Sequence, residues 1–164
     1  MDPNDLSFPL VAQVAEAGGL RVELGPDLGP VVSFRRAADE YNFRAPLGQC
    51  CEDPVVAPGG LTAFVRCSIV EGHGFDYHSL IKFQFGAGRL KDVTPESFLL
   101  GDEVANLTGS TQAWVCNLDR VSSDGRALLL RIGIQQPMKG GHAYFHYRPY
   151  WYELATKRLI EPDL

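Results

Sequence analysis

The amino-acid sequence predicts an all-β fold of antiparallel sheets with little helix, and three observations lead to this prediction. Segments of the second half match each other at a nearly constant spacing, as expected for stacked copies of one supersecondary unit. The apolar runs are short and rich in β-branched and aromatic residues, which favours strands. Turn sequences rich in glycine separate these runs, so we expect strands joined by hairpins.

The internal repeat is read from identical residues at two spacings. At a spacing of 65 residues the matches are Cys51/Cys116, Val56/Val121, Gly60/Gly125 and Arg66/Arg131. At a spacing of 69 they are Gly72/Gly141, His73/His142, Arg89/Arg158 and Leu90/Leu159. An insertion near residues 135–138 explains the change in spacing. The two predicted copies cover about residues 50–95 and 115–164.

Each copy contains two well-marked strand segments. In the earlier copy these are residues 61–70 and 79–85, and Gly86-Ala87-Gly88 forms the turn that follows. In the later copy they are residues 127–134 and 147–154, with a turn near 155–157. Asp124-Gly125 precedes the first of these as a tight hairpin, because both residue types tolerate positive φ. Pro58-Gly59-Gly60 holds the same place in the earlier copy.

The first 49 residues allow two interpretations within a single domain of residues 1–164. Gly18-Gly19-Leu20 is similar to Gly59-Gly60-Leu61, and residues 31–34 are similar to residues 80–83, which favours a shortened third copy. The alternative is a short helix over residues 9–17, with proline at its start and glycine at its end. Residues 37–41 are compatible with a further helical turn.

Residues 121–130 and 150–159, which hold Ser122-Ser123-Asp124-Gly125 and Thr156-Lys157, resemble a β-propeller blade of the TolB-like or WD-repeat-like kind. The likeness covers about 40 residues well and residues 56–95 weakly. It implies four-stranded antiparallel sheets and a binding role, and it carries over no catalytic residues. Two or three blades do not close a propeller ring. A sandwich, a small barrel, a partial propeller and a ring completed by several chains therefore stay open. A self-contained sandwich or barrel is favoured, because eight strands in one chain suffice for a core.

Charge and composition indicate the classes of partner and compartment. The chain has 20 acidic and 15 basic residues, for a net charge of −5, which disfavours nucleic acid as a partner and suits a protein with a basic face. No apolar run reaches the length of a membrane span, and residues 1–5 lack a signal pattern, so we expect a cytoplasmic protein that does not bind membranes. In that compartment the four cysteines are expected to be reduced.

All four histidines fall in the same connection of the two copies, which raises the alternative of a metal site. The candidate ligands are His73, His78, His142 and His146. On a strand, His142 and His146 point to the same face, so together the four imidazoles could bind zinc in a metal-dependent hydrolase or a metal-binding protein. The competing interpretation, which we prefer, is that Gly-His starts a strand and the imidazole holds a loop. No cofactor is then expected.

Residues 144–152 form an aromatic strand that carries large side chains on both of its faces. Alternation places Tyr144, His146, Tyr150 and Tyr152 on one face, and Phe145, Tyr147 and Trp151 on the other. One such face belongs in a core, so the second is available to a partner, and tyrosine, tryptophan and arginine dominate contact energies at interfaces. The predicted partner-binding residues are Tyr144, His146, Arg148, Tyr150 and Trp151.

The sequence thus favours a non-enzymatic protein-binding module, with an inhibitor or immunity protein that occludes its partner as the nearest analogy. Recognisable catalytic patterns are absent: there is no Gly-x-Ser-x-Gly elbow, no phosphate-binding glycine loop and no Cys-x-x-Cys pair. Self-association remains open, because unpaired sheet edges and faces need to be covered in some way.

Overall fold

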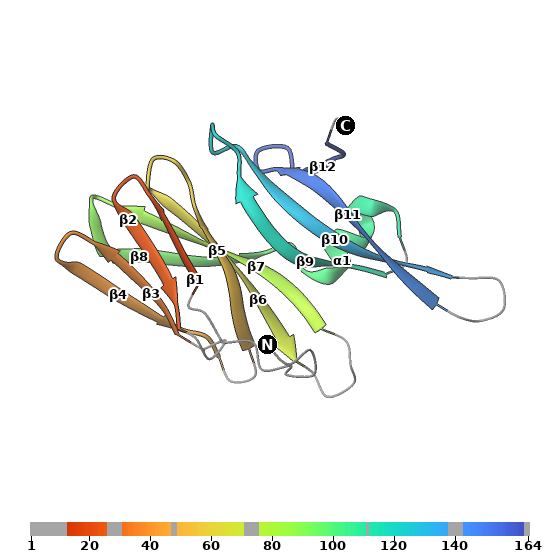
Figure 1. Ribbon diagram of the computed structural model, residues 1–164, viewed down its shortest axis with the longest axis horizontal. Coiled ribbons are helices and arrows are strands. Elements are labelled where there is room, and N and C mark those ends of the chain that lie inside the picture. Colours follow the sequence, from red (N-terminus) through yellow and green to blue (C-terminus); the bar gives the residue numbers. More distant parts are fainter. Residues whose placement is uncertain are drawn as a thin grey trace, which may run out of the picture.

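Three four-stranded antiparallel sheets, each built from strands that follow one another in the sequence, make up the protein (Figure 1). The structure is a computed structural model, and it describes residues 13–25, 31–46, 49–70, 76–110, 112–137 and 143–162. The predicted all-β class with little helix is confirmed. Within these residues the sheets form neither a closed barrel nor a closed propeller.

Every sheet is a meander in which neighbouring strands are joined in chain order. The first sheet contains β1 (Gln13–Ala17), β2 (Leu20–Leu24), β3 (Val31–Arg36) and β4 (Asp39–Arg44). The second contains β5 (Gln49–Val56), β6 (Thr62–Val70), β7 (Asp76–Gly86) and β8 (Arg89–Phe98). The helix α1 (Gly101–Thr108) then leads to the third, which contains β9 (Gln112–Val121), β10 (Ala127–Pro137), β11 (Ala143–Glu153) and β12 (Arg158–Ile160).

The second sheet lies between the other two, so it is apolar on both faces (Figure 1). Ala63, Val65 and Phe83 face the first sheet, where the ring of Phe34 lies 4.6 Å from that of Phe83. This alternation along β6 and β7 is the two-residue period of a strand buried on both sides.

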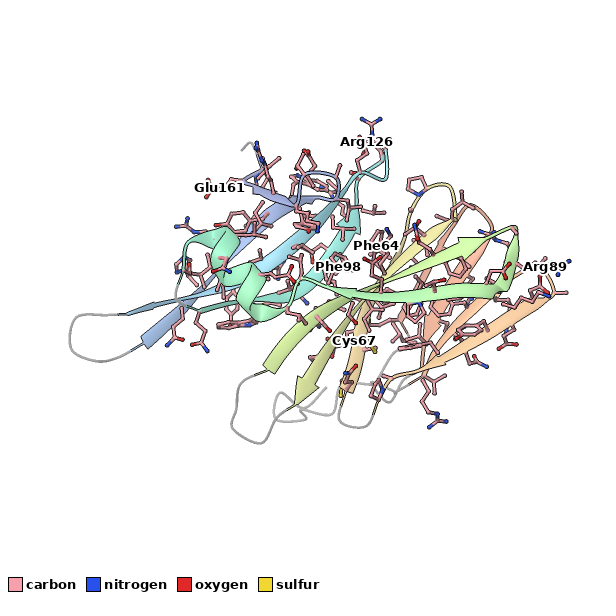
Figure 2. The ribbon with its side chains drawn as sticks, turned by 180° about the vertical axis from the view of Figure 1, so that it is seen from behind. Phe64, Cys67, Arg89, Phe98, Arg126 and Glu161 are labelled. Atoms are coloured by element: carbon pink, nitrogen blue, oxygen red, sulfur yellow. A yellow bond between two sulfur atoms is a disulfide. The ribbon has the colours of Figure 1, made fainter. Side chains whose placement is uncertain are left out.

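The opposite face of the second sheet packs on the third sheet and on α1. Phe64 and Leu80 enter this core, and Phe98 lies beside Phe64 in Figure 2. The ring of Phe98 is 6.2 Å from that of Phe64 and 6.2 Å from that of Tyr152, so it bridges the two sheets. Val104 of α1 is fully buried in the same core.

The first hairpins of the two predicted copies are equivalent in strand register as well as in sequence. Val56 pairs with Ala63, and 65 residues later Val121 pairs with Leu128. Their hairpins close with equivalent hydrogen bonds, from Ala57 N to Thr62 O at 2.9 Å and from Ser122 N to Ala127 O at 2.8 Å. Gly60 and Gly125 both adopt a positive φ in these turns. The match of Leu90 with Leu159 is displaced, because Leu159 stands opposite Tyr152 whereas Pro95 stands opposite the equivalent Phe83.

The first sheet shows that a third four-stranded unit precedes these two, and it corrects three details. Residues 13–17 are strand β1, so the helical interpretation of this stretch is wrong, and residues 37–38 form the turn between β3 and β4. The suggested alignment of residues 31–34 with residues 80–83 is also wrong. Phe34 and Phe83 point toward each other, whereas equivalent residues of stacked layers would point the same way.

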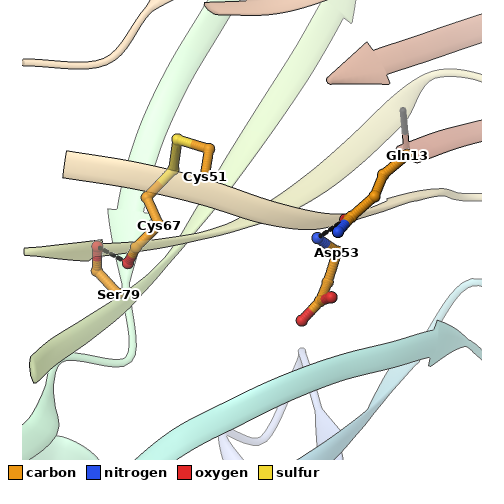
Figure 3. The surroundings of a disulfide bond; sticks show 5 residues. All are labelled: Gln13, Cys51, Asp53, Cys67 and Ser79. Atoms are coloured by element: carbon orange, nitrogen blue, oxygen red, sulfur yellow. Dashed lines mark hydrogen bonds between the residues drawn. A yellow bond between two sulfur atoms is a disulfide. The ribbon is translucent and has the colours of Figure 1, made fainter. Parts of the chain in front are cut away.

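The expectation of four reduced cysteines is wrong, because a disulfide joins Cys51 to Cys67 (Figure 3). These residues stand directly opposite each other on β5 and β6, with their Cα atoms 4.1 Å apart. Such cross-strand neighbours are within disulfide reach without rearrangement of the backbone. Cys50 and Cys116 are free.

Asp53 holds the three sheets together at a bulge in β5, where it adopts a φ of 55°. Its backbone N–H donates to Gln13 Oε1 of the first sheet at 2.6 Å, a contact drawn in Figure 3. Its carboxylate accepts from Arg66 Nε at 2.8 Å and from Leu118 N of the third sheet at 3.1 Å. Glu52 also pairs with Arg66, so this buried guanidinium is held between two carboxylates.

Candidate functional site

The outer face of the third sheet, which points away from the second sheet, is the candidate functional site. Its position follows from alternation, because Leu128, Leu130 and Tyr152 point into the core and their strand neighbours point out. The described residues of this third-sheet outer face are Gln112, Trp114, Cys116, Asn117, Asp119, Arg120, Ala127, Leu129, Arg131, Gly133, Gln135, Tyr147, Pro149, Trp151, Glu153, Arg158 and Ile160. Tyr147 and Ile160 are among the most exposed large apolar side chains in the part of the chain that the structure describes.

Trp114 lies flat on this face because the strand next to it has no side chain at Gly133. A Cβ atom at Gly133 would stand only 2.8 Å from Trp114 Cε2 and 2.9 Å from Cys116 Sγ. Trp114, Gly133 and Tyr147 are directly opposite each other on β9, β10 and β11. The glycine therefore fixes an aromatic platform across three strands, as aromatic residues often cover glycine in sheets.

A second aromatic group on the same face is Trp151, with the guanidinium carbon of Arg120 5.6 Å from the centre of its ring. This distance is within the range of cation–π attraction. Leu129 stands between the two residues in the ladder, and Ile160 follows Trp151 on β12. The four side chains form one continuous row across the sheet.

Between the two aromatic groups lies a depression of about 450 Å³ lined by Cys116, Asn117, Arg131 and Tyr147. Arg131 is 53% exposed there and forms a 3.9 Å ion pair with Asp119. Burial raises the pKa of the Cys116 thiol above its ordinary value of 9.0. A thiol in this state is a poor nucleophile at neutral pH, so the depression suits packing better than covalent chemistry.

The outer face of the first sheet, at the other end of the stack, has the opposite character. Glu16, Arg21, Arg35 and Glu40 form a row directly across its four strands. Arg21 pairs with Glu16 at 3.6 Å, and Arg35 pairs with Glu40 at 3.8 Å. This charged row is solvated, whereas the third-sheet outer face presents two tryptophans and a tyrosine.

The structure separates the five predicted partner-binding residues. Trp151 belongs to the third-sheet outer face, whereas Tyr150 is only 9% exposed and packs in the core. Arg148 points to the core side of β11, beyond the edge of the core, and forms an exposed 3.7 Å ion pair with Glu161. His146 is half-buried on the same side, and the side chain of Tyr144 lies outside the described residues.

Sequence reasoning missed most of the residues that do share the exposed face. Alternation along β11 places Tyr147 on the same side as Trp151, but the sequence of that strand alone does not show which side points inward. Trp114 and Arg131 come from separate strands, and only the pairing of β9 with β10 brings them together.

The structure describes only some of the proposed metal ligands. His73 and His142 lie outside the described residues, and of His78 only the backbone in β7 is described. Across the described ranges, no three histidine, cysteine or acidic side chains gather as a metal site. Nor does any helix in these ranges have the length and hydropathy to cross a membrane.

Comparisons with protein-family models, with curated proteins and with solved structures found no match for this chain.

Proposed function

We propose that this chain is a non-enzymatic protein-binding module that captures a protein partner on the third-sheet outer face and acts by covering the partner's surface, as inhibitor and immunity proteins do. The observation that carries this proposal is the contrast between the two ends of the stack. One end is covered by paired charges, and the other leaves Tyr147 exposed and Trp114 and Trp151 partly exposed.

The composition of this face is typical of binding surfaces. Tryptophan, tyrosine and arginine contribute most of the energy at protein interfaces because they combine large apolar area with a polar group. Large apolar side chains that gather on an exposed sheet face often mark an interaction site. Both tryptophans of the chain, Trp114 and Trp151, lie here.

The platform is also rigid, which lowers the entropy lost on binding. Trp114 is held over Gly133, and Trp151 is held beside Arg120. Both groups stand on strands whose other side is packed against the second sheet. The net charge of −5 would add long-range attraction to a basic partner, while the aromatic residues would supply the close contact.

The proposal is tested by site-specific photo-crosslinking in the native cell. A benzophenone amino acid at Tyr147 is expected to capture a discrete partner, and the same probe at Arg35, on the first sheet, is expected to capture none. Equal capture at the two positions, or none at Tyr147, would contradict the assignment of the surface.

Neighbouring substitutions on β11 provide the matched control. Tyr147→Ala is expected to weaken capture by at least about tenfold, because it removes an exposed ring from the contact face. Arg148→Ala changes the next residue, which points to the opposite side of the strand, and is expected to leave capture unchanged. The measurement is the yield of partner recovered with each variant at equal protein concentration.

A further inference from the structure

The three sheets follow one rule of stacking, and the third sheet obeys it only in part. In each sheet, one face covers the preceding sheet and the other is covered by the next sheet. Val22 and Phe34 of the first sheet lie under the second, and Phe64 of the second lies under the third. The corresponding row of the third sheet is Arg120, Leu129, Trp151 and Ile160, and none of the residues that the structure describes lies on it.

The equivalence of these rows comes from the hairpins. In each sheet the row is counted from the pair that closes the first hairpin: Ala17 with Leu20, Ala57 with Thr62, and Ser122 with Ala127. Two pairs further along the ladders stand Ala15/Val22, Val55/Phe64 and Arg120/Leu129. The third-sheet outer face is therefore the repeat counterpart of two faces that each carry a sheet.

The row that points backward has a different character in the first sheet than in the other two. In the second sheet this row is Val56, Ala63, Phe83 and Pro95, and in the third it is Val121, Leu128, Tyr152 and Leu159. In the first sheet the same positions hold the charged row of Glu16, Arg21, Arg35 and Glu40. Burying four charges against an aromatic face would cost more than their mutual attraction returns.

We propose that the partner docks as a fourth layer: an antiparallel β-sheet of another protein, with an aliphatic face, packs on the third-sheet outer face in the same way as the third sheet packs on the second. The charged row prevents a second copy of this chain from supplying that layer with its first sheet and so blocks end-to-end polymers. This inference rests on the proposed function and names the class of partner.

A charge comparison adds one feature to the partner. Arg66, covered by the third sheet, has 6% of its side chain exposed and is paired with Glu52 and Asp53. Among the described residues, its repeat counterpart Arg131 pairs with Asp119 alone, at 3.9 Å. A covering layer must satisfy this guanidinium as it loses water, so we expect the partner's aliphatic face to carry a carboxylate opposite Arg131.

The chain itself can be converted into the probe for this proposal. A donor variant carries Glu16→Val, Arg21→Leu, Arg35→Tyr and Glu40→Leu, which copies the backward row of the third sheet onto the first. It also carries Trp151→Glu, which places a charge in its own third-sheet outer face. In the wild type the third-sheet outer face can bind and the charged first sheet cannot. In the donor the first sheet can bind and the third-sheet outer face cannot.

Sedimentation velocity is expected to show wild type and donor each as a monomer and their equimolar mixture as a 1:1 complex. Wild type carrying Trp151→Glu alone is the matched control, and its dissociation constant for the donor is expected to be at least about tenfold higher. The four-substitution variant without Trp151→Glu is expected to form polymers that grow with concentration.

Two results would overturn the fourth-layer proposal. One is a mixture of folded donor and folded wild type, verified by circular dichroism, that sediments as two monomers. The other is a wild-type dimer that Trp151→Glu dissociates, because a second copy would then be the occupant. Capture of a native partner at Tyr147 together with either result would keep the proposed function and remove only the layer geometry.

Discussion

At the scale of single residues, Asp53 shows how one side chain can connect three layers. It sits at a bulge, where the extra residue turns its carboxylate out of the regular ladder toward Leu118 and Arg66. Its φ of 55° is a conformation that aspartate and asparagine tolerate better than other non-glycine residues. The bulge thus places an acidic group where the first strands of the second and third sheets meet.

Replacement of Asp53 by asparagine isolates the contribution of its charge, since asparagine keeps the shape and tolerates the backbone conformation. We expect Asp53→Asn to lower the free energy of unfolding by about 2 kcal/mol, because Arg66 stays buried with one carboxylate instead of two. Asp119→Asn removes the partner of the exposed Arg131 and is expected to cost less than about 1 kcal/mol. Chemical denaturation measures both, and equal losses would contradict the role given to Asp53.

At the scale of elements, β11 shows what a strand pattern can and cannot predict. Its alternation correctly separates Tyr150 and Tyr152 from Tyr147 and Trp151. Which face of β11 points inward could not be predicted from the sequence, because both faces carry aromatic rings and are similarly hydrophobic. The choice follows from the pairing of β11 with β10, whose core-facing residues are Leu128, Leu130 and Ile132.

The disulfide between β5 and β6 is a second property that depends on register. Cys51 is buried on β5, and its oxidation depends on Cys67 standing directly opposite. A slip of one residue would have turned Cys67 to the other face of the sheet. The compartment argument could not supply this pairing.

The bond should therefore add measurable stability. The double variant Cys51→Ala/Cys67→Ala is expected to lose about 3 kcal/mol in the free energy of unfolding, mainly because the unfolded chain is no longer constrained. Cys50→Ala leaves the bond intact and is the control. Alkylation of the unfolded wild type without reductant should modify two of its four cysteines, and modification of all four would contradict the pairing.

At the scale of the whole molecule, the described sheets form a stack with a charged face on the first sheet and an aromatic face on the third. The two later sheets could be predicted from the repeat because their first hairpins have the same length and register. The first sheet could not be aligned correctly, since its turn at Gly18-Gly19 has two residues where the turn after Ala57 has four. Because of this difference, an alignment by identical residues pairs positions that lie on opposite faces of their sheets. Such an alignment does not show that the charged row of the first sheet is equivalent to buried apolar rows of the other two.

The third-sheet outer face can be observed directly by its tryptophans, because Trp114 and Trp151 are the only tryptophans in the sequence and both lie on this face. Chain labelled with 5-fluorotryptophan gives two fluorine resonances, and transfer from light to heavy water is expected to shift both in the isolated protein. In the complex with the partner captured at Tyr147, both resonances should move and the solvent effect should largely disappear. Resonances that keep their positions and their sensitivity to heavy water in that complex would show that the partner binds elsewhere.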